Sequence, residues 1–219
     1  ERLFISVSPD GLNWTALNNG NPVWQPEGWS GWGNVVRDPA ILYHEGFYWV
    51  AYTSGNYGRH AAFGLVKSRD LLNWTFVGNI SVPVPGATDQ LTWSPVFFKD
   101  GDGSVHVFVN ISPTGGSTYS PVGMKTYETH PVSDDWTLWS APQLVELPGG
   151  HSNELFVWKE GDTYHGIYVD FSTGSPWIKV SSRNLTHGWS TPKWLGKATF
   201  EGALILKKSD GSGYRFYVE

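Results

Sequence analysis

The sequence predicts an all-β fold, a five-bladed β-propeller that is incomplete in this chain because the last blade is partly missing. Three observations predict it: a tryptophan-containing phrase that returns at regular spacing, a hairpin-like phrase between its copies, and a composition rich in Gly, Pro and Trp. Sequence that repeats at a fixed period is typical of propellers and other repeat folds. No segment of ten or more residues shows a convincing helical period, which leaves strands and turns.

The composition is that of a β-rich globular protein and excludes several classes of partner. Apolar residues make up 40% of the 219 residues and charged residues only 16%, with 26 Gly, 14 Pro and 13 Trp. A net charge of −5 offers no basic surface to nucleic acid or acidic lipid. No apolar run is long enough to span a bilayer. The sequence contains no Cys, which excludes disulfides and thiolate metal sites.

Four copies of one phrase recur along the chain, and each combines a polar turn with a Trp. They read SPDGLNWT at 8–15, SRDLLNWT at 68–75, SDDW at 133–136 and SSRNLTHGW at 181–189. Their tryptophans follow one another at about 55–60 residues, the length of a four-stranded blade: Trp14, Trp74, Trp136 and Trp189. We expect the Asp to turn the chain into the outer strand of each blade, and the Trp to be buried between neighbouring blades.

A second phrase, a β-rich run, a turn and an aromatic strand, predicts the hairpin that begins each blade. Its copies cover 36–54, 92–110, 152–170 and 200–219. The chain then reads as one propeller domain, 1–219, with these parts: outer strands of a closing blade and a loop at 1–35, complete blades at 36–88, 92–147 and 152–198, and the start of a fourth blade at 200–219. Because an open ring should be unstable, we expect a fragment, or missing strands that lie beyond Glu219.

Aligning the hairpins places one residue of each at the start of the innermost strand, at one mouth of the channel: Asp38, Ser94, Glu154 and Glu201. Neighbouring carboxylates repel one another, so three at equivalent positions suggest a function, whereas a single acid at an exposed strand start would be unremarkable. Inverting glycoside hydrolysis needs a carboxylate base and a carboxylic acid about 6.5–9.5 Å apart. A third carboxylate can raise the pKa of the acid and keep it protonated.

In these phrases the chain resembles glycoside hydrolase family 43, five-bladed propellers that cleave arabinose- and xylose-containing plant polysaccharides. VRDPAILYHEGFYWVAYTS is similar to the family's Asp-Pro base motif, and LTWSPVFF to its Trp-Ala-Pro motif. NELFVWKEGDTY is similar to the segment that carries the pKa-modulating acid, and FEGALILKK to the Glu-Gly-Pro acid motif. The resemblance implies that Asp38 is the general base, Glu154 the pKa modulator and Glu201 the general acid of an O-glycosyl hydrolase.

Three positions depart from the family pattern. Glu154 replaces the usual Asp, Ala203 replaces the Pro of the acid motif, and Val96 fills a place often held by Asp or Glu. The leading hypothesis is an inverting α-L-arabinofuranosidase or β-xylosidase acting on plant cell-wall glycans. The alternatives are a catalytically weak or inactive carbohydrate-binding propeller, and an invertase-like glycosidase; the latter's Trp-Glu-Cys-Pro motif is missing here, where Trp93 precedes Ser94.

Candidate substrate-binding residues are flat or polar side chains close to the acids in sequence. Trp29 and Trp32 lie in the Gly-rich loop before Asp38, and Trp93 adjoins the second inner strand; for each, blade packing is the alternative. His151 is close enough to Glu154 to reach the channel.

The sequence assigns no metal ligand and predicts no cofactor. The seven His residues include no His-x-x-x-His pair. Members of the family often hold a metal or water on the channel axis, but with a His from the last blade, most of which we expect this chain to lack.

Five Asn-x-Ser/Thr sequons indicate a secreted glycoprotein, although two of them belong to the repeated phrase and can serve packing. They are Asn13, Asn73, Asn79, Asn110 and Asn184. The chain begins with Glu1, so we expect that a signal peptide has been removed or lies outside it. We expect a secreted monomer that acts on an oligo- or polysaccharide.

Overall fold

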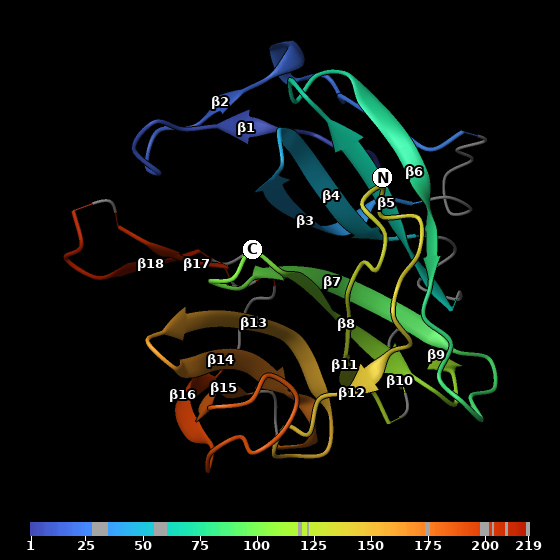
Figure 1. The fold of residues 1–219 in the computed structure, drawn as a ribbon, viewed down its shortest axis with the longest axis vertical. Coiled ribbons are helices and arrows are strands. Elements are labelled where there is room, and N and C mark those ends of the chain that lie inside the picture. The colour runs from blue at the N-terminus through green and yellow to red at the C-terminus, as the bar shows by residue number, and fades with distance from the viewer. Residues whose placement is uncertain are drawn as a thin grey trace.

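Regular structure in this protein is almost entirely antiparallel β-sheet (Figure 1). The computed structural model describes residues 1–27, 35–54, 61–117, 120–121, 123–173, 176–197, 202, 204–208 and 210–217. The described helical segments are two single 3-10 turns, η1 (Asn18–Gly20) and η3 (Phe171–Thr173). Within these ranges, no helix has the length and apolar character needed to cross a membrane.

Three sheets have four strands each, and we call them blades 1, 2 and 3. Blade 1 contains β3 (Arg37–His44), β4 (Phe47–Thr53), β5 (Ala62–Ser68) and β6 (Trp74–Ser81). Blade 2 contains β7 (Leu91–Lys99), β8 (Val105–Ser112), β11 (Lys125–Thr129) and β12 (Gln143–Leu144). Blade 3 contains β13 (Ser152–Glu160), β14 (Thr163–Asp170), β15 (Pro176–Ser182) and β16 (Lys193–Lys197). In each blade, the strand that comes first in the sequence (β3, β7 or β13) lies at one edge of the sheet.

Two-stranded sheets occupy the two ends of the chain. They are β1 (Ser6–Val7) with β2 (Thr15–Ala16), and β17 (Leu204–Lys207) with β18 (Tyr214–Tyr217); a third small pair joins β9 (Gly116–Ser117) and β10 (Ser120–Pro121). The terminal sheets meet, because Arg215 donates to the carbonyl of Asp10 and the Tyr217 hydroxyl donates to the carbonyl of Gly11. The first and last sheets of the chain are therefore neighbours.

The edge strands β3, β7, β13 and β17 contact one another in this order, as the innermost strands of a propeller do. This arrangement confirms the predicted all-β propeller fold. The second strand of each blade lies inside its sheet with both faces covered, so β8 is buried along nearly its whole length. One apolar core, which includes Trp49, Phe63 and Val107, joins blades 1 and 2. Another, which includes Phe108 and Leu155, joins blades 2 and 3.

The Asp of the repeated phrase turns the chain, as predicted. Asp70 Oδ1 accepts the backbone N–H groups of Leu72 at 2.9 Å and Asn73 at 2.7 Å. Asp10 Oδ1 makes the same two bonds in its own copy, at 2.8 and 2.9 Å. Backbone donors favour the ionised carboxylate, so the pKa of each Asp lies well below its ordinary value.

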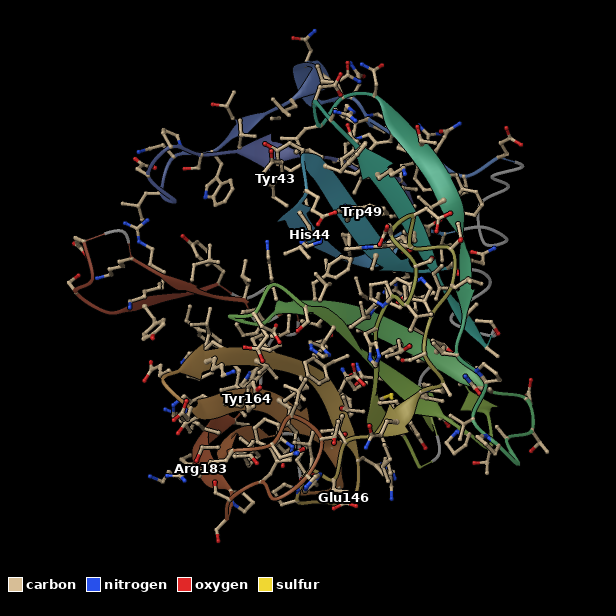
Figure 2. The ribbon with its side chains drawn as sticks, in the orientation of Figure 1. Tyr43, His44, Trp49, Glu146, Tyr164 and Arg183 are labelled. Atoms are coloured by element: carbon tan, nitrogen blue, oxygen red, sulfur yellow. The ribbon has the colours of Figure 1, made fainter. Side chains whose placement is uncertain are left out.

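The Trp of the phrase is buried in one copy and exposed in another. Trp136 is 4% exposed and stacks on Trp49 of blade 1, with ring centroids 3.9 Å apart; Trp49 is labelled in Figure 2. Trp14 is 54% exposed, so the prediction that it is buried between blades was wrong. Its ring partner is Tyr217, at 6.2 Å, and a two-stranded sheet offers less surface than a complete blade. Trp74 and Trp189 are half-buried.

Candidate active site

Each of the three blades begins with the same irregularity in its innermost strand. The ladder shifts register between Arg37 and Ala40, between Trp93 and Val96, and between Asn153 and Phe156. These shifts are β-bulges, which bend a strand and redirect a side chain. In blades 1 and 2 the residue inside the bulge is followed by Pro39 or Pro95, which has no N–H to donate to a ladder.

The bulged residues adopt a conformation that few residues other than Gly adopt. Asp38, Ser94 and Glu154 have φ values of 48°, 44° and 55°. Left-handed backbone at an ordinary residue costs free energy and is found disproportionately at functional sites. The repeat therefore places the same strained bulge, three times, at the positions that the sequence alignment put at the channel mouth.

The three bulges line one cavity of about 380 Å³ between the innermost strands. Asp38, Ser94 and Glu154 share its wall with Gly202, the residue that follows Glu201. Glu201 itself lies outside the described residues. The structure thus brings two of the three predicted carboxylates to one cavity, while the catalytic roles of all three stay predictions.

Asp38 is oriented by a buried hydroxyl. The Thr53 Oγ1–H donates to Asp38 Oδ2 at 2.7 Å, and the backbone N–H of Ser94 donates to Thr53 Oγ1 at 2.8 Å. Thr53 is fully buried at the end of β4, so its hydroxyl has little freedom to turn away. Within the described ranges, Asp38 Oδ1 accepts no hydrogen bond from protein. One carboxylate oxygen is therefore held in place while the other remains free to accept a proton.

A buried polar chain extends from this point through blade 2 to blade 3. Asn110 Nδ2 donates to the carbonyl of Ser94 at 3.4 Å, and Thr126 Oγ1 donates to Asn110 Oδ1 at 3.1 Å. Thr126 Oγ1 also lies 2.9 Å from Ser152 Oγ, two residues before Glu154. Asn110 and Thr126 are 1% and 0% exposed, so the chain is shielded from water. Buried polar networks whose hydrogen bonds are all satisfied rigidify their surroundings, which here include the bulges at Ser94 and Glu154.

Glu154 is held against the segment that follows Glu201 in the sequence. Its side chain is buried, and Oε2 accepts the backbone N–H of Gly202 at 2.6 Å. Hydrogen bonds to an ionised carboxylate are short and strong. Gly202 has a φ of 68°, a value that Gly adopts without strain.

Two of the four predicted sugar-binding residues, Trp93 and His151, do not line the described part of the cavity. Trp93 is half-buried, and its indole Nε1 is buried without a hydrogen-bond partner among the described residues. His151 is half-buried and absent from the same wall, with its carbonyl accepting the N–H of Phe171 at 2.9 Å. Trp29 and Trp32 lie outside the described residues. A binding role for these four residues stays a prediction.

Sequence reasoning singled out Val96 but missed the rest of the apolar wall of the cavity, which includes Ile41, Phe97, Phe156 and Leu204. A signal for part of it was present, because Val96 and Phe156 each follow a bulged residue by two positions in the aligned hairpins. A second hollow of about 520 Å³, beside Trp24 and Phe76, has Glu27 as the one carboxylate in its described lining. Its described lining therefore contains no pair of carboxylates.

Comparisons with known proteins identify the family of the chain. The family model Glyco_hydro_43_rel, described as "Probable glycosyl hydrolase domain", matches residues 1–219. The chain belongs to this family. The resemblance to glycoside hydrolase family 43 is thereby confirmed, and the domain is a glycoside hydrolase domain. No curated protein matches the sequence.

Solved structures of glycosidases share the fold. The endo-arabinase from Bacteroides thetaiotaomicron superposes with a TM-score of 0.73 at 13% identity, over 98% of this chain and 84% of that one. An α-L-arabinofuranosidase from Clostridium thermocellum gives 0.69 at 19% identity, over 98% and 69%. A xylan β-1,4-xylosidase from Bacillus halodurans gives 0.65 at 13% identity, over 98% and 43%.

Proposed function

We propose that this glycoside hydrolase domain cleaves arabinose- or xylose-containing plant cell-wall glycans with inversion at the anomeric carbon. The observation that carries the proposal is the cavity in which identical bulges present Asp38 and Glu154, with Gly202 on the same wall. Asp38 is the base and Glu154 the modulator, while Glu201, the neighbour of Gly202 in sequence, is the acid. The arabinase, arabinofuranosidase and xylosidase structures that share the fold support this class of substrate.

The proposed reaction is a single displacement by water. Asp38 accepts a proton from a water molecule as its oxygen forms a bond to the anomeric carbon. The glycosidic carbon–oxygen bond breaks on the opposite face, and the leaving oxygen takes the proton of Glu201. Glu154, a second negative charge near that acid, keeps the acid protonated until substrate is bound.

The wall of the cavity suits this chemistry in two ways. Thr53 fixes one oxygen of Asp38, so the free oxygen approaches the water from a constant direction. Phe156, Ile41 and Leu204 offer apolar surface for the apolar faces of a sugar ring.

A substrate panel tests the proposal. Nitrophenyl α-L-arabinofuranoside, β-xyloside and β-galactoside are incubated with the purified protein, and NMR follows the anomer released first. We expect hydrolysis of the arabinoside or the xyloside, with the inverted anomer appearing before mutarotation. Retention of configuration would exclude the single displacement.

A non-catalytic carbohydrate-binding propeller is favoured by one observation, the apolar Val96 on the cavity wall. Binding of arabinan or xylan oligosaccharides by calorimetry, without hydrolysis of any panel member, would support that function and contradict ours.

We further propose that the protein is secreted, because the Asn side chains of four of its five sequons are exposed. The fifth, Asn110, is 1% exposed and engaged in the polar chain, so it cannot carry a glycan in the folded protein. Expression in a secreting eukaryotic host, followed by glycosidase treatment and mass spectrometry, tests which Asn residues are modified. Modification at Asn110 of folded protein would contradict the assignment of that residue to the core.

A further inference from the structure

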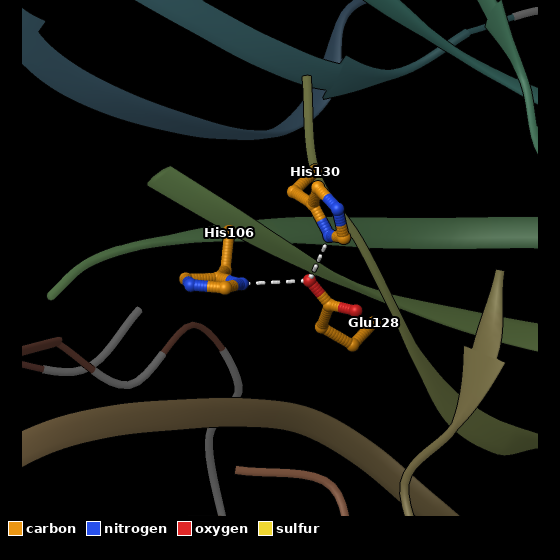
Figure 3. Close-up of side chains that lie close together, drawn as sticks. All are labelled: His106, Glu128 and His130. Carbon is orange, nitrogen blue, oxygen red and sulfur yellow. Dashed lines mark hydrogen bonds and ion pairs between the residues drawn. The ribbon is translucent and has the colours of Figure 1, made fainter. Parts of the chain in front are cut away.

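Two imidazoles in blade 2 converge on one oxygen of a buried carboxylate, away from the candidate active site. His106 Nδ1 lies 2.7 Å and His130 Nδ1 3.0 Å from Oε1 of Glu128, as Figure 3 shows. The three ligand atoms all lie within 4.8 Å of one another. The Glu128 side chain is only 5% exposed, against 18% for His106 and 43% for His130.

The strand register explains why these residues meet. β8 and β11 pair Val107 with Thr129, which sets His106 and His130 opposite each other just beyond the last pair. Glu128 precedes His130 by two residues and therefore faces the same side of the sheet. The three residues lie near the hairpin turn of blade 2, and none of them lines the cavity that contains Ser94.

The hydrogen bonds around His106 leave Nδ1 of a neutral ring without a proton to share with Glu128. The Ser104 hydroxyl has one proton, which it donates to Asp102 Oδ1 at 2.6 Å. Ser104 Oγ must then accept from Nε2–H of His106, at 3.1 Å, which assigns the proton of the neutral ring to Nε2. Nδ1 of that ring is a lone pair that faces a carboxylate oxygen. Either an additional proton or a metal ion is needed to join them.

We propose that His106, Glu128 and His130 bind a divalent transition-metal ion of the zinc type. Two imidazole nitrogens and one carboxylate oxygen form the ligand set of three-ligand zinc sites, in which water takes the fourth position. The chain Asp102–Ser104–His106 orients the imidazole from behind, as outer partners of zinc-bound His residues do. Ca²⁺ and Mg²⁺ prefer oxygen ligands, so two nitrogens disfavour them.

The side chains need only a small movement to accept the ion. Zinc–ligand bonds of about 2.0–2.1 Å in tetrahedral geometry set neighbouring ligand atoms about 3.4 Å apart, somewhat more than the present 2.7 and 3.0 Å. His130 is the most exposed of the three and can supply most of this movement.

A bound metal would tie strand β8 to the loop that carries Trp136. His130 and Ser140 close this loop, because the N–H of Ser140 donates to the carbonyl of His130 at 2.9 Å. Within the loop, Trp136 stacks on Trp49 of blade 1. We therefore expect the ion to stabilise the contact between blades 1 and 2, independently of the proposed hydrolysis.

Calorimetry and thermal melting of untagged, chelator-treated protein test the site with Zn²⁺, and with Co²⁺ as a spectroscopic probe. Wild type should bind one Zn²⁺, melt several degrees higher with it, and give the visible absorption of tetrahedral Co²⁺. His130→Ala, at the most exposed ligand, should keep its fold and bind at least tenfold more weakly. His187→Ala, which removes an exposed His outside the cluster, is the matched control and should bind as wild type does.

Three outcomes would overturn the proposal. Absence of saturable Zn²⁺ binding would mean that a proton alone joins the groups. Zn²⁺ binding by His130→Ala, and by a second variant, Glu128→Gln, that is as tight as binding by wild type would place the metal elsewhere. An equal rise in melting temperature with Ca²⁺ or Mg²⁺ would exclude a nitrogen-ligated site.

Discussion

Blades 1 and 2 have the same backbone at the channel mouth and different side chains on it. Asp38 and Ser94 have nearly equal φ values, 48° and 44°, inside equivalent bulges, and both precede Pro. The partner strands then differ: Thr53 donates to the Asp38 carboxylate, whereas Asn110 donates to the Ser94 carbonyl. The repeat therefore supplies a strained position that faces the cavity in each blade. The residue at that position differs between the blades, a carboxylate in blade 1 and a hydroxyl in blade 2.

The largest effect should come from removing the carboxylate of blade 1. Asp38→Asn keeps the size of the side chain and an acceptor for Thr53, but it cannot take a proton from water. We expect kcat to fall roughly 10²–10⁴-fold with an unchanged melting temperature. Ser94→Ala, at the equivalent position in blade 2, is the matched control and should cost far less. Similar losses in both variants would mean that the bulges contribute shape and not a base.

The second largest effect should be on stability, because the Trp residues of the repeated phrase are buried to different extents in blades 1 and 2. Trp136→Ala in blade 2 removes a ring that is 4% exposed and should lower the free energy of unfolding by roughly 3–5 kcal/mol. Trp74→Ala in blade 1 removes a half-buried ring and should cost less. Denaturant unfolding of the two variants measures the difference, and equal losses would contradict the unequal packing.

The partner strands provide a sharper comparison between catalysis and stability. Thr53→Val keeps the shape of the side chain but removes the donor to Asp38 and the acceptor of the Ser94 N–H. We expect the free energy of unfolding to fall by about 1–3 kcal/mol. We expect kcat to fall more than KM rises, with recovery in Thr53→Ser. Asn110→Leu breaks the equivalent contact in blade 2 and should reduce stability without a specific effect on kcat. A kcat loss in Asn110→Leu as large as that in Thr53→Val, at matched stability, would show that Thr53 acts only through the fold.

The positions of Asp38, Ser94 and Glu154 were predictable because a repeat lets one hairpin be aligned on another. Pro39 and Pro95 even mark where the ladder must break. Thr53 was not predictable, because the alternation of inward and outward side chains along β4 does not reveal which polar side chain reaches the bulge on the neighbouring strand β3. His106 and Glu128 meet only through the register of β8 and β11, which spacing along the chain does not encode. The exposure of Trp14 depends on how much surface the neighbouring sheet offers, and this is a property of the assembled ring.

The smallest expected effect concerns the Asp of the repeated turn. Hydrogen bonds from the side chain of Ser133, and from the side chain and N–H of Thr137, lower the pKa of Asp135 to about 2. A carboxyl whose pKa is depressed by folding stabilises the native state above its unfolded pKa, and this contribution is lost as the pH falls through the folded value. Wild type should therefore melt above Asp135→Asn at neutral pH, with the gap closing between about pH 4 and pH 2. In blade 1, Asp70 has a pKa that is depressed further, mainly by the N–H of Asn73, so the gap for Asp70→Asn should close at a lower pH. Melting curves of the three proteins across this range measure both gaps. Gaps that stay constant with pH would mean that the turns depend on side-chain shape and not on the ionised carboxylate.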